Sequence, residues 1–156
     1  MKRILASLLF LVVITSAQEF NFIKFATENG LSLSQVSALE EHPNGTIIIG
    51  TYGGGIDFYD GSQFQNISIK DGLSSNLIYS LILTDQNNLL IGTSKGLDSY
   101  SSNGTVKRYL FKEFNENIIW KFIKDDNKIW ICSENGLFQL QNDSLKSIIK
   151  DVRIFD

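Results

Sequence analysis

Few residues of this sequence have the types and spacing that enzyme or metal chemistry needs. The chain contains one histidine, His42, and one cysteine, Cys132. It therefore cannot supply a Cys/His zinc tetrad, and no Cys–His catalytic pair stands out. His42 precedes Pro43 in a turn and has no second histidine with which to share a metal. We expect His42 to have an exposed, structural role.

Two short segments resemble ligand-binding loops but lack essential parts. Residues 51–55 (Thr-Tyr-Gly-Gly-Gly) could be mistaken for a phosphate loop, yet residues 56–59 indicate a strand where such a loop needs a helix. Residues 125–127 (Asp-Asp-Asn) look like the start of a calcium loop, but the glycine and the bidentate glutamate are missing. Both segments are predicted to be interstrand turns. We expect no metal, no cofactor and no catalytic residue.

The composition is that of one folded, acidic domain. The chain has 156 residues, of which 43% are hydrophobic, and a formal net charge of -3. This length can bury a core without disulfides or metals, and the chain is too apolar to be disordered. Nucleic-acid binding needs clustered Lys and Arg to displace counterions, so the acidic balance argues against it.

The N-terminus indicates export. Two basic residues precede an unbroken run of apolar and small residues at 4–14, and further small residues lead up to Ala17. We predict a signal peptide over residues 1–17, cleaved between Ala17 and Gln18. Eleven helical residues rise only about 17 Å, against a hydrocarbon core of roughly 30 Å, so a membrane anchor is not favoured. The mature protein is expected in the periplasm, outside the cell or at its surface. We expect the single cysteine, Cys132, to be buried in a strand.

The remainder of the chain repeats itself about every 41 residues. Gly30-Leu31-Ser32 recurs as residues 72–74, and residues 48–51 (Ile-Ile-Gly-Thr) recur as residues 90–93 (Leu-Ile-Gly-Thr). A third copy, residues 130–133 (Trp-Ile-Cys-Ser), follows the second. Periods of roughly 40 to 50 residues are typical of propeller blades or helical arrays.

The pattern within each repeat favours blades. Short apolar runs rich in β-branched residues alternate with turn signals, including Asp60-Gly61 and Asn103-Gly104, and no stretch of the mature chain sustains a helical stripe. The predicted strands are residues 36–40, 46–51, 55–59 and 63–69 in the first copy, and 78–82, 89–93, 96–100 and 105–111 in the second. We predict an all-β fold: a partial β-propeller of about three four-stranded antiparallel blades.

These motifs resemble the two-component regulator propeller repeat, whose pattern is approximately Gly-Leu-Ser/Pro, an apolar strand, an Asp/Asn-Gly turn, Leu-Trp-Ile-Gly-Thr and Gly-Gly-Leu. The likeness covers almost all of residues 26–140. The usual Trp survives only as Trp130, and the third copy lacks Gly-Leu-Ser and has Cys132-Ser133 in place of Gly-Thr. The resemblance implies the outward-facing sensor propeller of a hybrid histidine kinase or related receptor of Bacteroidetes, commonly one that detects a glycan. Such proteins continue into further blades, a membrane helix and signalling domains, so we expect this chain to be truncated.

The expected organisation is an incomplete ring. Four to eight blades usually close a propeller, so three leave two apolar faces that favour self-association or contact with further blades. The predicted parts are the signal peptide 1–17, a lone opening strand 18–28, blades at 29–70, 71–112 and 113–150, and the start of a truncated fourth repeat at 151–156.

Candidate ligand-binding residues are sought where the repeats differ. Six aromatic residues could stack against a sugar ring, but most occupy strand positions where blade packing is the simpler role. Tyr52 is the exception, because it lies in the turn between the second and third strands, where its counterparts are Ser94 and Glu134. Tyr52, Ser94, Lys95 and Glu134 are the predicted site residues. The six aromatic residues are Tyr52, Tyr59, Tyr79, Tyr100, Trp120 and Trp130.

The favoured function is an exported, non-enzymatic sensing or binding module, glycan-responsive as the resemblance implies. Its expected partners are a carbohydrate or other small ligand, and further blades or a second copy of the chain. Neither nucleic acid nor a membrane span after signal cleavage is expected. The alternatives are a truncated gene fragment, an interaction scaffold without independent function, and a propeller lyase or hydrolase. Any histidine kinase activity would belong to downstream domains.

Overall fold

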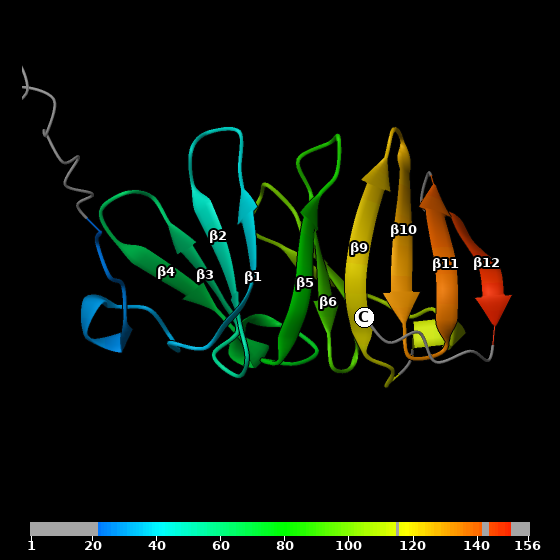
Figure 1. Ribbon diagram of the computed structural model, residues 1–156, viewed down its shortest axis with the longest axis horizontal. Coiled ribbons are helices and arrows are strands. Elements are labelled where there is room, and N and C mark those ends of the chain that lie inside the picture. Colours follow the sequence, from blue (N-terminus) through cyan, green and yellow to red (C-terminus); the bar gives the residue numbers. More distant parts are fainter. Residues whose placement is uncertain (1–21, 115, 142–143, 151–156) are drawn as a thin grey trace, which may run out of the picture.

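The computed structural model describes residues 22–114, 116–141 and 144–150. The predicted signal peptide, its cleavage site at Ala17 and Gln18, and residues 151–156 lie outside the described residues. Within them the chain forms twelve strands in three four-stranded antiparallel sheets, each built from four consecutive strands (Figure 1). The predicted all-β fold and its three blades are therefore confirmed.

The strand boundaries follow the repeat. Blade 1 consists of β1 (Val36–Glu41), β2 (Ile47–Thr51), β3 (Ile56–Tyr59) and β4 (Phe64–Ile67). Blade 2 consists of β5 (Ile78–Leu83), β6 (Leu89–Thr93), β7 (Gly96–Tyr100) and β8 (Val106–Tyr109). Blade 3 consists of β9 (Ile119–Asp125), β10 (Lys128–Ser133), β11 (Gly136–Gln141) and β12 (Ser144–Lys150). The described residues contain no α-helix; short 3-10 turns, η1 (Thr27–Asn29), η2 (Ile69–Asp71) and η3 (Lys112–Phe114), precede the three blades.

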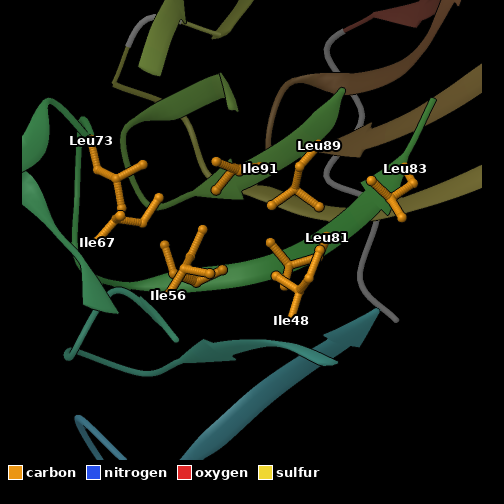
Figure 2. Close-up of a cluster of buried hydrophobic side chains, with 9 residues drawn as sticks. Ile48, Ile56, Ile67, Leu73, Leu81, Leu83, Leu89 and Ile91 are labelled. Carbon is orange, nitrogen blue, oxygen red and sulfur yellow. The ribbon is translucent and has the colours of Figure 1, made fainter. Parts of the chain in front are cut away.

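The hydrophobic core lies between the blades. The first strands β1, β5 and β9 pack side by side, and the three sheets follow one another along the molecule (Figure 1). One buried cluster joins blades 1 and 2, with Ile48 and Ile56 from blade 1 meeting Leu81 and Ile91 from blade 2 (Figure 2). A second cluster joins blades 2 and 3 around Leu97 and other buried side chains. Each sheet thus buries apolar surface by stacking on its neighbour.

The glycine of the Ile-Gly-Thr motif makes this stacking possible. A Cβ atom at Gly50 would lie 2.8 Å from Cγ2 of Ile78 in the next blade, and one at Gly92 would lie 2.9 Å from Cγ2 of Ile119. The third repeat has Cys132 at this position, on the opposite sheet face from the buried Ile131. Cys132 is only half-buried, which corrects the expectation of a buried thiol. Its side chain faces the outer side of blade 3, where no described blade covers it.

The serine of the Gly-Leu-Ser motif clamps the start of a blade to its third strand. The backbone N–H and hydroxyl of Ser32 donate to Asp57 Oδ2 at 3.0 and 2.6 Å. Ser74 donates to Asp98 Oδ2 in the same way, at 2.7 and 2.8 Å. Both aspartates are buried. Asn66 Nδ2 satisfies the other oxygen of Asp57 at 3.0 Å, so the first clamp is complete.

The second clamp lacks this last hydrogen bond. Arg108 is paired with Asp98 across the sheet, as Asn66 is with Asp57. The Arg108 guanidinium instead donates to the carbonyl of Lys95 at 3.0 Å. Asp98 Oδ1 is consequently left without a partner, and burial raises the pKa of this carboxyl.

The third blade replaces the clamp with aromatic packing. Phe138 occupies the position of Asp57 and Asp98, and its ring lies 5.0 Å from that of Phe114 in an edge-to-face arrangement. Both phenylalanines are buried. The loss of Gly-Leu-Ser from the third repeat is therefore matched by the loss of the buried carboxylate that it would bind. The hydroxyl of Ser133 still donates to Gly136 O at 3.2 Å, as the equivalent threonines do in the other blades.

The described part of the expected opening strand is not a strand. Residues 22–28, the described part of the predicted strand 18–28, contain no strand, and Thr27–Asn29 is a 3-10 turn. No strand pairing joins this segment to β4, the outermost strand of blade 1. Side chains hold it instead: the ring of Phe25 packs 4.9 Å from that of Tyr59 and 5.6 Å from that of Phe64.

The outer faces of the arc expose apolar side chains. Leu39 in β1 is 63% exposed, whereas its counterpart Leu81 in β5, covered by blade 1, is 8% exposed. Ile123 in β9 is also exposed on the far blade. The expected association with further blades or with a second copy stays a prediction.

Removing the buried acceptor of the first clamp should destabilise the fold. Asp57→Ala leaves both donors of Ser32 without their acceptor and removes one of the hydrogen bonds of Asn66, so we expect a loss of about 3 kcal/mol in the free energy of unfolding, measured with urea. Asp60→Ala is the control, because Asp60 also accepts three hydrogen bonds but lies in an exposed turn. Equal losses in the two variants would contradict the importance of burial.

The motif glycine should tolerate no side chain where a blade follows. Gly92→Ala places a methyl group against Ser80 and Ile119, and we expect it to lower the unfolding free energy by about 2 kcal/mol. Cys132→Ala, at the equivalent position of blade 3, should change it by less than about 1 kcal/mol. Thermal and urea unfolding measure both, and a similar loss in the two variants would argue against packing between blades as the cause.

Candidate functional site

Each first strand carries a β-bulge at the same place. The register skips one residue between Val36 and Ala38 in β1 and between Ile78 and Ser80 in β5, and β9 skips one opposite the step from Cys132 to Ser133. A bulge leaves one residue without a cross-strand partner and re-aims its side chain, and bulges are frequent next to functional sites. The residues singled out in this way, one from each blade, are Ser37, Tyr79 and Trp120.

Two of these bulged residues form an aromatic row with Tyr52. The rings of Tyr52 and Tyr79 have centroids 5.2 Å apart at an interplanar angle of 78°, and those of Tyr79 and Trp120 are 5.1 Å apart at 77°. Both contacts are edge-to-face. Tyr52 is 40% exposed, and the other two side chains are half-buried. We call Tyr52, Tyr79 and Trp120 the aromatic row; it draws on all three blades.

Blade 1 has Ser37 at its bulge and therefore no aromatic ring there. Its β2–β3 loop supplies the ring of Tyr52 instead. This loop is tied to blade 2, because the N–H groups of Gly53 and Gly55 both donate to the carbonyl of Asn76 at 3.1 Å. Tyr52 itself forms an isolated bridge with Leu77, directly before β5. The glycines have φ values of 136° and 86°, which favour glycine over other residues. The predicted turn at residues 51–55 is therefore confirmed, and it positions Tyr52 beside Tyr79.

The two tyrosine hydroxyls of the row form a hydrogen bond. Their oxygens are 2.8 Å apart. Burial, and then the hydrogen bond with Tyr52, raises the pKa of Tyr79 to about 12. The Tyr79 hydroxyl stays uncharged throughout the physiological range. The row thus combines aromatic surface with uncharged hydroxyls, a combination that suits an uncharged polar ligand with an apolar face.

Three of the predicted site residues occupy one equivalent position per blade. The N–H groups of Tyr52, Ser94 and Glu134 donate to the carbonyls of Gln35, Leu77 and Ile118, at 2.9, 3.1 and 3.0 Å. Each acceptor directly precedes the first strand of its blade. These residues therefore lie at the same end of the strands, the lower end in Figure 1.

The polar members of the predicted set differ in their surroundings. The hydroxyl of Ser94 lies 2.7 Å from that of the buried Ser75. Lys95 is exposed at the tip of the β6–β7 turn, and its carbonyl accepts from Arg108. Glu134 is half-buried in the β10–β11 turn.

Sequence reasoning missed Tyr79 and Trp120 as site residues. It assigned them to blade packing because they occupy strand positions. A signal was present, since the three repeats have Ser, Tyr and Trp at this position while the residue before it is Val or Ile in each. The bulge that turns this position out of the ladder depends on strand pairing, which the sequence alone does not show.

The described residues offer little for catalysis or metal binding. No three His, Cys, Asp or Glu side chains among them are grouped so as to hold a metal ion. His42 is half-buried in its turn, with Nδ1 2.7 Å from Asn44 Oδ1. Asp125 ends β9 and Lys128 begins β10, so the calcium-like segment is the predicted hairpin turn. Of the helices described, none has the length and apolar character needed to cross a membrane.

Comparison with known proteins confirms the fold. No protein-family model and no curated protein matches the sequence. Among solved structures, the extracellular domain of BT3049, described as a hybrid two-component system of B. thetaiotaomicron, is 23% identical over 79% of this chain and 18% of that chain, with a TM-score of 0.67. The extracellular domain of BT4673 from the same organism is 19% identical over 92% of this chain and 20% of that chain, with a TM-score of 0.74. This chain spans about a fifth of either structure.

An enzyme with a propeller fold is also similar. Virginiamycin B lyase from Staphylococcus aureus is 10% identical over 77% of this chain and 43% of that chain, with a TM-score of 0.61. At these identities the similarities establish the architecture alone. The fold resemblance inferred from the repeat motifs, to sensor propellers of Bacteroides two-component systems, is borne out at that level.

The hydroxyl contact within the aromatic row can be tested by titration. Tyr52→Phe removes one cause of the raised pKa of Tyr79 and leaves burial in place, so the pKa should fall but stay above the ordinary value for tyrosine. Tyrosinate absorbance against pH measures the shift. Tyr59→Phe is the control, since the Tyr59 hydroxyl donates only to the Gly61 carbonyl among the described contacts. An unchanged high-pH titration in Tyr52→Phe would show that the hydrogen bond is absent in solution.

Proposed function

We propose that this chain is an exported, non-enzymatic binding module of a sensor, and that it binds a carbohydrate across the aromatic row. The observation that carries the proposal is the row itself, in which Tyr52, Tyr79 and Trp120 are brought together from three blades. Residues used only for blade packing would be expected at repeat-equivalent positions. In blade 1 the equivalent of Tyr79 is Ser37, and the ring comes from a different position.

The chemistry of the row supports a sugar ligand. The apolar face of a pyranose packs on aromatic side chains, and its hydroxyls need neutral donors and acceptors. The paired hydroxyls of Tyr52 and Tyr79 can offer both roles, and the Ser75–Ser94 pair lies at the same end of blade 2. Tyr52 is exposed enough to meet a ligand directly.

The sensor role rests on the fold. The similar structures from B. thetaiotaomicron are described as extracellular domains of two-component or one-component systems. The predicted signal peptide agrees with an extracytoplasmic location. This chain spans about a fifth of those structures. Its role in signalling and its lack of enzyme activity are therefore parts of the proposal. We infer no catalytic role for the row.

An interaction scaffold is the second candidate. It is favoured by the apolar outer faces, where Leu39 is 63% exposed. Such a scaffold would contact further blades or a second copy through these faces. It would not require the aromatic row.

Binding at the row should be measurable with purified protein and a panel of neutral oligosaccharides. We expect at least one to bind saturably by calorimetry, and Trp120→Ala to weaken binding by about tenfold or more, because it removes the stacking surface at one end of the row. Trp130→Ala is the matched control, since Trp130 lies on the opposite sheet face from the buried Ile131, away from blade 2. A folded protein that binds no member of the panel would overturn the proposal, as would equal effects of the two tryptophan variants.

A further inference from the structure

A cleft opens between blades 2 and 3 at the strand ends opposite the aromatic row. It has a volume of about 170 Å³ and lies beneath the β5–β6 and β9–β10 turns. Its apolar wall consists of Leu90, Ile129 and Leu140, and Tyr109 lines it as well. Lys124 and Asp85, joined by an ion pair at 2.6 Å, stand at its rim. These residues lie outside the candidate site described above.

The cleft exists because two repeat positions change to smaller residues. Between blades 1 and 2, Phe58 fills the corresponding space and packs on Tyr100, with ring centroids 5.1 Å apart. Between blades 2 and 3, the equivalents of Phe58 and Tyr100 are Ser99 and Leu140. Both replacements are smaller, and the space that the two rings occupy in the first interface is open in the second.

The serine that replaces the ring adds a hydroxyl to the lining of the cleft. Ser99 lines the cleft and is only 8% exposed. Its hydroxyl has no hydrogen-bond partner among the described residues, yet it is not one of the buried polar atoms that lack a partner, so the cleft leaves it open to solvent. An accessible hydroxyl in this position can donate to or accept from a ligand.

The size and polarity of the cleft indicate the class of ligand. An engineered cavity of about 150 Å³ accepts one benzene ring, so this volume suits a single six-membered ring. The amides of Asn88, Asn127 and Gln141 line the cleft and provide both donors and acceptors. Lys124 is neutralised by Asp85, and Asp126 stands nearby, so the rim does not favour an anion.

We propose that this interblade cleft binds a single neutral sugar ring, with its apolar face on Leu90, Ile129 and Leu140 and one hydroxyl on Ser99. The cleft and the aromatic row lie at opposite ends of the strands. The proposal therefore stands on separate residues, and either site can fail without the other.

The first test is binding of defined monosaccharides, followed by NMR of isotopically labelled mature protein. The probes are D-glucose, D-galactose, D-mannose and D-xylose, with phenol as an apolar ring of similar size. We expect at least one aldose to cause saturable shifts at Ser99 and Leu140, and Ser99→Ala to weaken its binding by about tenfold, because the hydroxyl contact is lost. No response to any aldose, or a response to phenol alone, would overturn the proposal.

The second test closes the cleft with the residue that blade 1 uses. Ser99→Phe should abolish the aldose shifts and raise the urea midpoint of the ligand-free protein, since it fills the space as Phe58 does. If Ser99→Phe does not fold, Leu140→Tyr closes the cleft from the other wall with the residue found in blade 2. Trp130→Ala is the control and should leave the aldose shifts unchanged, because Trp130 lies on the outer face of blade 3 and lines neither the cleft nor the row. Aldose binding that survives closure, or is lost in Trp130→Ala, would place the ligand elsewhere and overturn the proposal.

Discussion

The structure depends on the face-to-face packing of neighbouring blades. A four-stranded sheet cannot bury both of its faces by itself, so each repeat gains stability only by stacking on the next. The exposure of Leu39 and Leu81 shows this dependence. The two leucines occupy the same repeat position, which is largely exposed at the end of the arc and buried inside it. The motif glycines at 50 and 92 serve this packing directly, since the following blade occupies the space of a side chain.

Within each blade, a polar clamp complements the apolar stacking. In the first two repeats a serine from the connecting segment binds a buried aspartate in the third strand. In the third repeat the serine is lost and Phe138 packs on Phe114 instead. A buried carboxylate without its donors would be costly, so the two changes must occur together. The third blade keeps the fold by exchanging hydrogen bonds for aromatic packing.

The proposed sites lie where repeats that share a backbone differ in their side chains. At the bulge of the first strand the residues are Ser37, Tyr79 and Trp120, and only the last two contribute rings to the aromatic row. In the third strand, Phe58 closes one interblade space and Ser99 leaves the next one open. Positions that every blade needs for stacking carry the motif, and positions released from stacking are available for a ligand.

The period, the succession of four strands in each blade and the turns were predictable before the fold was known, because they follow from local hydrophobic alternation and from glycine and asparagine signals. The sequence also singled out Tyr52, through its difference from Ser94 and Glu134. Only the tertiary structure placed Tyr79 and Trp120 beside Tyr52, removed the expected strand at residues 22–28 and showed the half-exposed Cys132. A bulge, a ladder partner and an interblade space depend on which side chains meet across sheets, and contacts between residues some 40 positions apart are not encoded in any local pattern.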